Sequence, residues 1–442
     1  MHYACSVRIL LVSQDSFCVS FATQASGLFS AERTCTVFRF IAAAIAIYVG
    51  TLSMALPKAQ TQPDGKSIFR FDTFGSEQLW TDVLQMQHVI PAKVSPKTAL
   101  SVGLKVDVDA LPPTIIEGLR AKQVDLDDPA VTVQLLKLNA VVGVRGKVVG
   151  ANDNLATVGI TCALCHSTVD DSFAPGIGKR LDGWANTTLN PGAIIALSPA
   201  ITGTAKAYYS SWGPGKYDPR FHIFDGVNVI DLIDPMADPP TPVVIPPAYA
   251  LQGVGFETFN ADGPISYWNQ YVAVTQMGGQ GSFSDPRIGV IVTQTPDLVE
   301  PKLSALVQYE LSLPKPPPPS GSFNRSAARR GADLFAGEAG CATCHKQPFF
   351  TDVSSPPDPT LPLPFLHDPS EIPTNPAYAA RSATKSWRTT PLRGLWQHPP
   401  YFHDGSAATL LDVVNRYNDD PRFSLGLTKR QKADLVEFLK TL

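Results

Sequence analysis

Cys162-Ala-Leu-Cys165-His166 and Cys341-Ala-Thr-Cys344-His345 are two copies of one five-residue pattern, and this pattern decides the fold. Two residues between the cysteines let both sulfurs span the vinyl edge of one porphyrin, and the histidine that follows turns under the iron. This is the spacing of a c-type haem attachment site. The sequence therefore predicts two covalently bound c-type haems, with His166 and His345 as proximal iron ligands.

Two other kinds of site also use paired cysteines. A thioredoxin-like redox pair would need a βαβ context, and a zinc site would need the two pairs close together in the sequence. The two pairs lie far apart, so haem is the preferred interpretation for both. The remaining cysteines, Cys5, Cys18 and Cys35, all lie near the start of the chain. Beyond that leader every cysteine belongs to a haem motif, and none is left for a disulfide.

The composition indicates a chain with substantial cores and many ordered loops. Its 442 residues are enough for two or three domains. Proline occurs 40 times, well above the usual share of about one in twenty. The net charge of -3 argues against a nucleic-acid binder. We expect a mainly α fold of two cytochrome c-like haem domains with long proline-rich loops, the N-terminal domain being enlarged.

Residues 1–59 have the character of an export leader. The segment Phe40–Leu56 is apolar and uncharged, and it is shorter than the roughly 20 residues of a typical membrane span. Small residues near Ala55 and Ala59 suit cleavage by a signal peptidase. Because c-type haem is attached outside the cytoplasm, we expect a periplasmic or extracytoplasmic protein. A signal peptide is favoured over an uncleaved N-terminal anchor, which would be the chain's sole contact with a membrane.

Proline also marks a boundary between the two expected haem domains. The run at 314–321 (PKPPPPSG) favours an extended, stiff polyproline segment. We therefore expect an N-terminal haem domain over 60–313, a linker at 314–321 and a C-terminal cytochrome c domain over 322–442.

Local patterns predict several helices around these motifs. The stretch 131–149 indicates short helices with a strand or hairpin, and Val299–Leu313 indicates a helix with an apolar face. Asn324 is placed to cap a helix that leads to the second motif, and Thr428 with Gln431 forms a capping box before the last helix. We expect these two helices of the C-terminal domain to pack together.

The second axial ligand of each iron is less evident. The last methionine is Met277, so the C-terminal module has no methionine of its own. Its sixth ligand is a tyrosine, a histidine, an imported residue or nothing. For the first haem, His222 is the best-placed distal histidine. The aromatic residues from Tyr208 to Phe224 line either a haem pocket, a substrate channel or, more simply, an irregular core.

At this point the chain resembles a known family. Over Phe323–Leu442 a CxxCH follows an Ala-Arg-Arg-Gly-x-x-Leu-Phe helix, and Thr-Pro-Leu-Arg, Pro-Tyr-Phe-His-Asp-Gly-Ser and a final Asp-Leu-Val-Glu-Phe-Leu helix come after it. This combination resembles the bacterial di-haem cytochrome c peroxidase and MauG family. The resemblance implies one low-spin, electron-receiving haem and one haem that reacts with hydrogen peroxide.

The resemblance also implies roles for individual residues. Tyr417 falls at the distal ligand position of the C-terminal haem, where the MauG branch has tyrosine and the peroxidases have methionine. The family's catalytic Glu-Met pair is represented by Gln276-Met277, and glutamine cannot carry a proton. The family's calcium would take backbone carbonyls near His398 and Pro400. Trp268 is the candidate for the family's inter-haem tryptophan.

We expect an exported di-haem oxidoreductase in which the C-terminal haem relays electrons to an N-terminal haem that reacts with peroxide. Its partners would be a small redox protein or quinol-linked donor, and hydrogen peroxide or another small oxidant. A non-catalytic di-haem electron carrier is the alternative that Gln276 favours. A haem oxygenase acting on an organic substrate is the third alternative, suggested by the aromatic residues at 208–224.

Overall fold

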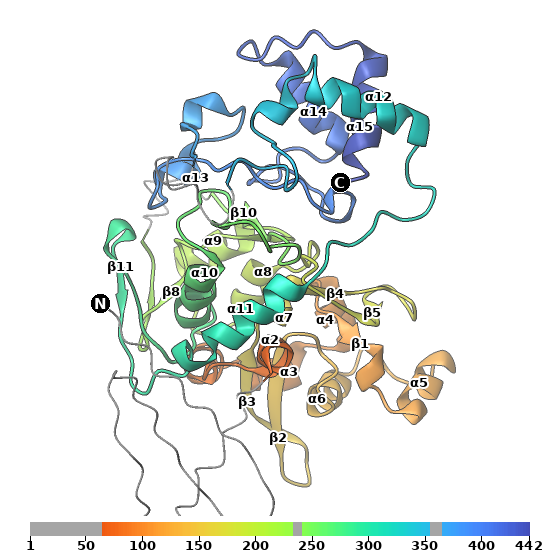
Figure 1. Cartoon of the computed structure of the whole chain (residues 1–442). Coiled ribbons are helices and arrows are strands. Elements are labelled where there is room, and N and C mark those ends of the chain that lie inside the picture. Colours follow the sequence, from red (N-terminus) through yellow and green to blue (C-terminus); the bar gives the residue numbers. More distant parts are fainter. Residues whose placement is uncertain (1–63, 233–240, 354–364) are drawn as a thin grey trace, which may run out of the picture. The chain divides into compact units, whose positions relative to one another are not determined.

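The computed structural model describes residues 64–232, 241–353 and 365–442 (Figure 1). These residues belong to one compact unit. The predicted export leader, residues 1–59, lies outside them. Within the described ranges, no helix has both the length and the apolar character needed to cross a bilayer.

Ten α-helices precede the proline-rich segment in the described part of the chain. They are α2 (Gly65–Phe71), α3 (Met86–Lys93), α4 (Pro96–Ser101), α5 (Pro113–Arg120), α6 (Pro129–Lys137), α7 (Ala163–His166), α8 (Pro191–Ile195), α9 (Gly203–Ser211), α10 (Ile265–Tyr271) and α11 (Leu303–Ser312). The helices after it are α12 (Arg325–Ala336), α13 (Ala377–Ala380), α14 (Leu410–Asp419) and α15 (Lys429–Leu439). Shorter or wider helical turns are η1 (Gln78–Val83), η2 (Val108–Ala110), η3 (Val272–Gln276), η4 (Pro286–Ile288), η5 (Glu300–Lys302), η6 (Cys341–Thr343), η7 (Pro369–Glu371) and η8 (Leu395–Gln397).

The strands are short and form two-stranded sheets. The parallel pair is β1 (Val106–Asp107) with β5 (Ile177–Gly178). The antiparallel pairs are β2 (Val144–Val149) with β3 (Asn154–Ile160), β4 (Ser167–Val169) with β6 (Arg180–Asp182), β7 (Lys216–Tyr217) with β10 (Val243–Val244), β8 (Ile223–Phe224) with β9 (Val229–Ile230), and β11 (Phe283–Asp285) with β12 (Val290–Val292). The described residues are therefore helix-rich with small sheets, as the sequence predicts. The division into two haem domains stays a prediction.

The expected segment at 131–149 contains both a helix and half of a hairpin. Helix α6 is capped by Asp128, whose side chain accepts from Ala130 N, and β2 follows it and pairs with β3. Strand β3 ends at Ile160, two residues before the first haem motif. The β2–β3 hairpin therefore leads directly into the first haem motif.

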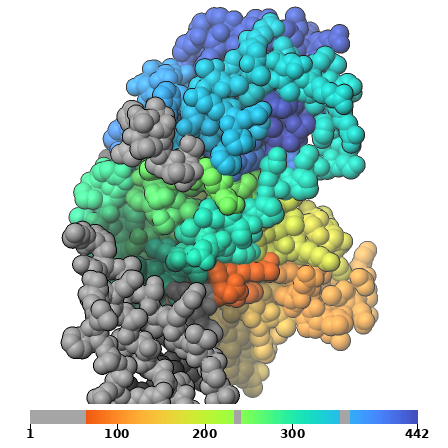
Figure 2. Space-filling model, in the orientation of Figure 1, coloured from red at the N-terminus to blue at the C-terminus, as the bar shows by residue number. Residues whose placement is uncertain are grey.

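The apolar core falls into two large clusters and a small one. The largest contains fully buried side chains from before the proline-rich segment, such as Phe69, Leu79 and Trp212. The second contains Phe335 and Leu435 from the C-terminal helices. In the space-filling view, side chains fill most of the spaces between the ribbons on this face (Figure 2).

The helices α12 and α15 lie side by side, as predicted (Figure 1). Asn324 caps α12 by accepting a 3.0 Å bond from Ala327 N, and Thr428 with Gln431 forms the capping box of α15. A Cβ on Gly331 would lie 2.0 Å from the carbonyl oxygen of Asp434, so only glycine allows this close crossing. The predicted helix at Val299–Leu313 is also confirmed, as η5 followed by α11.

Candidate functional site

The first haem motif is a single helical turn held by backbone contacts. Cys162 precedes α7, and Thr161 N donates to the carbonyl of Gly143 at 2.9 Å. A Cβ on Gly143 would lie 2.1 Å from the backbone nitrogen of Leu164, so glycine is required for the motif to approach the β2–β3 hairpin. The motif is therefore held firmly against the core.

His166 is oriented as a proximal haem ligand needs to be. Its Nδ1 lies 3.0 Å from the carbonyl oxygen of Pro246. A backbone acceptor at Nδ1 fixes the tautomer and leaves Nε2 free for a metal. Burial lowers the pKa of His166 to about 4, so the imidazole is neutral at pH 7. Neutral imidazole is the form that ligates iron.

The second motif repeats this arrangement in a different local setting. Cys341 begins the turn η6, which follows α12 and the left-handed residue Gly340. His345 Nδ1 lies 3.0 Å from the carbonyl oxygen of Phe350. Burial lowers the pKa of His345 as well. Both motif histidines therefore have a backbone acceptor at Nδ1 and an available Nε2.

One continuous cavity contains both motifs. Its volume is about 910 Å³, and its wall is mostly apolar. The motif residues on this wall are Cys162, Cys165, His166, Cys341, Cys344 and His345. The two sequence motifs, far apart in the chain, thus face a shared space.

The cavity fits haem in its polar groups as well. Arg388 and Arg393 lie on its wall, and Arg388 Nε and Arg393 Nη2 are buried without a hydrogen-bond partner in the described part of the chain. Unpaired buried donors are rare because they cost free energy. An anionic group such as a haem propionate would satisfy them. Together with the cysteine pairs and the histidines, these donors are suited to holding haem.

The motif thiols lie in a buried setting that does not suit a reactive redox pair. Burial raises the pKa of Cys165 to about 12 and that of Cys341 to about 11. Burial also raises the pKa of Cys162 well above its ordinary value. Redox-active cysteines have lowered pKa values because the thiolate is the nucleophile. All four motif cysteines are unpaired, which leaves them free for thioether bonds.

Tyr417 lies on the wall of the cavity near the second motif. It is part of α14, and Cys341 and Cys344 are close enough to contribute to its raised pKa, although burial is the largest cause. Its ring packs edge-on against Phe423 at 5.2 Å between centroids. Within the described residues its hydroxyl makes no hydrogen bond, so it is available to a ligand in the cavity. The role of Tyr417 as an iron ligand stays a prediction.

Gln276 also lies on the wall, at the end of η3, where its amide is already engaged. Its Nε2 donates to Thr275 Oγ1 at 2.8 Å and to the carbonyl of Pro219 at 3.3 Å. Its Oε1 accepts a hydrogen bond from the hydroxyl of Tyr217. The side chain is therefore held in one orientation. Its predicted catalytic role is not tested by this geometry.

His222 is placed differently from the sequence-based expectation. It is not among the described residues that line the cavity, and its Nδ1 is bonded to the hydroxyl of Tyr209 at 2.7 Å. The structure thus offers no support for His222 as a distal ligand. Of the aromatic residues from Tyr208 to Phe224, only Tyr217 lines the cavity, and the others are mostly buried in the core. Core packing is the interpretation that these positions favour.

Two buried glutamates on the cavity wall were not singled out from the sequence. Glu310 is 3% exposed and Glu257 is 6% exposed. Burial raises the pKa of Glu310 to about 8 and that of Glu257 to about 7, the latter despite an ion pair with Arg388 at 3.2 Å. Glu310 shares the apolar face of α11 with Leu306. A carboxylate on such a face is a sequence signal that could have identified it.

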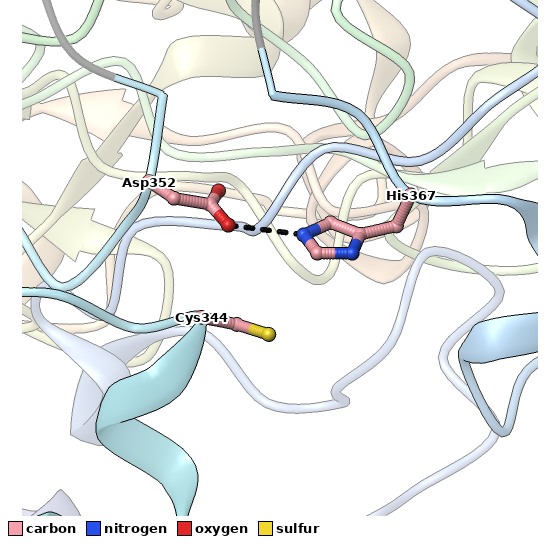
Figure 3. A group of neighbouring side chains, drawn as sticks. All are labelled: Cys344, Asp352 and His367. Atoms are coloured by element: carbon pink, nitrogen blue, oxygen red, sulfur yellow. Dashed lines mark hydrogen bonds and ion pairs between the residues drawn. The ribbon is translucent and has the colours of Figure 1, made fainter.

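Cys344, Asp352 and His367 form a further group of side chains that could ligate a metal ion (Figure 3). His367 Nε2 lies 3.0 Å from Asp352 Oδ2, and its Nδ1 lies 3.1 Å from Glu371 Oε2. Asp352 and His367 point toward each other, and the sulfur of Cys344 faces the same space (Figure 3). Because we assign that sulfur to a thioether, we interpret the group as a hydrogen-bonded clamp next to the second motif.

Three further predicted residues lie on the same wall. They are Trp268, His398 and Pro400. Trp268 is held by a 3.2 Å bond from Nε1 to the carbonyl of Glu257. The predicted calcium near His398 and Pro400 stays a prediction.

Comparison with known proteins supports the resemblance, although no family model matches the chain. The methylamine utilization protein MauG of Methylorubrum extorquens is 34% identical over 131 residues, which are 26% of this chain and 34% of that protein. The cytochrome-c peroxidase IdrP1 of Denitromonas iodatirespirans is 31% identical over 152 residues, 26% of this chain and 40% of that protein. The hydrazine synthase subunit gamma of Kuenenia stuttgartiensis is 27% identical over 198 residues, 44% of this chain and 46% of that protein.

A solved MauG-like protein associated with microbial copper homeostasis aligns with 46% of this chain and 73% of its own, at 22% identity and a TM-score of 0.33. The chain spans less than half the length of the curated relatives that it matches. The sequence similarities confirm the expected relation. The chain is related to the MauG and di-haem cytochrome c peroxidase family, whose cofactors are c-type haems.

Proposed function

We propose that this chain is an exported di-haem c-type oxidoreductase of the peroxidase or MauG kind. In this proposal the C-terminal haem relays electrons, and the N-terminal haem reacts with hydrogen peroxide. The protein acts in the periplasm or another extracytoplasmic space and receives electrons from a small redox protein or a quinol-linked donor. The observation that carries the proposal is the single cavity lined by both CxxCH motifs.

The chain's own residues would hold two haems in defined orientations. The cysteine pairs supply the thioether bonds, and His166 and His345 present Nε2 because backbone carbonyls occupy Nδ1. The guanidinium groups of Arg388 and Arg393 are suited to propionates. Bound haems supply electron transfer and, where one axial position is open, the reduction of peroxide.

A non-catalytic electron carrier is the second candidate, and one observation favours it. The amide of Gln276 is engaged by Tyr217, Thr275 and Pro219, and an amide cannot exchange a proton with peroxide as a carboxyl group can. In this candidate both irons would carry two protein ligands.

Electron paramagnetic resonance of the isolated ferric protein separates the two candidates. The oxidoreductase requires one high-spin haem with an open axial position beside one low-spin haem. Hydrogen peroxide should then change the spectrum of the high-spin haem. Two low-spin signals, unchanged by partial reduction and by peroxide, would rule out the enzyme and leave the electron carrier.

A further inference from the structure

Tyr209 and His222 form a hydrogen-bonded pair in the core of the protein. The hydroxyl of Tyr209 lies 2.7 Å from His222 Nδ1, and the two residues are 1% and 0% exposed. His222 Nε2 is buried and has no hydrogen-bond partner in the described part of the chain. A purely structural histidine normally has both ring nitrogens satisfied, so this arrangement needs an explanation.

The protonation states of the pair follow from burial. Burial lowers the pKa of His222 to about 4, so the ring is neutral and Nδ1 can accept the phenolic hydrogen bond. Burial also raises the pKa of Tyr209, and the carboxylates of Asp231 and Asp218 raise it further. The phenol therefore keeps its proton at rest. If Tyr209 loses an electron, its proton must leave with it, and His222 is the base in contact.

An unbroken series of aromatic rings leads from Tyr209 to the cavity. The ring centroids of Tyr209 and Trp212 are 5.0 Å apart, and those of Trp212 and Tyr217 are also 5.0 Å apart. Tyr217 lines the cavity together with Cys165 of the first motif. Electron transfer falls off steeply with distance, so these successive ring contacts divide the path from Tyr209 to the cavity into short steps.

We propose that Tyr209 and His222 form an internal redox site that serves the first haem. Tyr209 loses one electron, which passes by way of Trp212 and Tyr217 to the oxidised haem. Its phenolic proton moves to His222 Nδ1, so a neutral tyrosyl radical and an imidazolium remain. The haem is reduced by one electron. The site thereby stores one oxidising equivalent away from the cavity. This inference rests on the proposed function, because hydrogen peroxide is the oxidant that first oxidises the haem.

A tyrosine at such a site needs a free base at its hydroxyl and ring contacts that lead to the cavity. Each neighbouring tyrosine lacks one of these two features. Tyr217 reaches the cavity, but its hydroxyl is bonded to the amide of Gln276, which is not a base. Tyr208 donates to Asp218 at 2.9 Å, but that carboxylate is paired with Arg381, and the ring of Tyr208 stacks on Phe221. Tyr208 is therefore a matched control, since it is a buried tyrosine adjacent in sequence.

The test is freeze-quench electron paramagnetic resonance of the full-length holoprotein with two oxidants. One oxidant is hydrogen peroxide, and the other is photogenerated ruthenium(III) tris-bipyridine, which does not depend on peroxide chemistry. We expect a tyrosyl signal that narrows when the protein carries ring-deuterated tyrosine. The signal should be lost in Tyr209→Phe and kept in Tyr208→Phe.

A second measurement needs no variant. In wild-type protein labelled with ¹⁵N-histidine, electron–nuclear double resonance should detect a nitrogen coupled to the radical, because His222 faces the phenoxyl oxygen. This measurement keeps the inference testable if Tyr209→Phe does not fold.

The outcomes separate this inference from the proposed function. A tyrosyl signal with ruthenium but not with peroxide supports the Tyr209–His222 site and contradicts the peroxide reaction. Peroxide consumption without a tyrosyl signal from either oxidant overturns the site and leaves the proposed function intact. A signal that persists in Tyr209→Phe, or that shows no histidine coupling, also overturns it.

Discussion

Asn269 Nδ2 donates a 2.6 Å hydrogen bond to the buried carboxyl group of Glu310, and both residues line the haem-motif cavity. No cationic side chain is paired with Glu310 in the described ranges. Burial therefore dominates and raises its pKa to about 8 from an ordinary 4.5. A carboxyl group that stays protonated when folded but ionises when unfolded disfavours the folded state as the pH rises.

Glu310→Gln should consequently stabilise the protein at alkaline pH. Between the ordinary pKa and about 8, the unfolded wild-type chain releases a proton that the folded chain keeps, and the variant has no such proton. The gain in the free energy of unfolding at pH 8 should be on the order of 3 kcal/mol, and close to zero at pH 4. Urea unfolding from pH 4 to pH 8 measures it. Glu338→Gln, which changes an exposed carboxylate on the same wall, is the control. If the free energy of unfolding changes with pH in the same way in wild type and in Glu310→Gln, Glu310 does not have a raised pKa in the folded protein.

Tyr417→Phe should alter the spectrum of the C-terminal haem alone. The hydroxyl of Tyr417 is free of hydrogen bonds within the described residues, and the side chain lies beside both cysteines of the second motif. Loss of an anionic oxygen ligand should change the spin state and raise the reduction potential of that haem. Visible absorption and redox titration measure both. The control is Tyr401→Phe, because Tyr401 also lines the cavity but its hydroxyl is bonded to the carbonyl of Leu395 at 2.8 Å. Identical spectra for the two variants would remove Tyr417 as a ligand.

Gln276→Glu should increase the rate of reaction with hydrogen peroxide. The variant places a carboxyl group on the cavity wall, where general acid–base assistance contributes about 10²-fold or more. Stopped-flow absorption at several pH values measures the rate and the new pH dependence. Gln280→Glu makes the same change four residues away, where the side chain bonds the carbonyl of Pro296 instead. Equal rates for both variants would show that position 276 does not face the reacting atoms.

His367→Gln should weaken the C-terminal region below neutral pH. The hydrogen bond to Asp352 is the largest cause of the raised pKa of His367. Its contribution to stability is therefore complete below the ordinary value of 6.5 and is lost as the pH rises through the raised value. At pH 6 the variant should lose about 1.5–3 kcal/mol of unfolding free energy, as expected for a hydrogen bond to a charged group. Thermal unfolding from pH 5 to 9 tests this. His88→Gln, a change at an exposed position, is the control. If the wild-type unfolding temperature does not vary from pH 5 to 9 in the way described, the hydrogen-bonded clamp around His367 does not contribute to stability.

The sequence by itself predicted those features that depend on residues close together in the chain. The spacing within each CxxCH motif predicted the haem sites, and the caps at Asn324 and Thr428 correctly predicted the terminal helices. Such patterns can be read directly because their physical cause, the geometry of one helical turn or one porphyrin edge, spans only a few residues. The relation to the MauG and peroxidase family rests on the same kind of local pattern.

The tertiary structure decided what surrounds each motif. Glu257 pairs with Arg388, and His222 meets Tyr209 rather than the cavity. Neither outcome follows from spacing, because each depends on how separate segments pack and on which side chains that packing removes from water. Burial then sets the pKa of Glu310 and of His222, and no local pattern carries that information. The two motifs are nearly identical in sequence, and their different surroundings are a property of the fold.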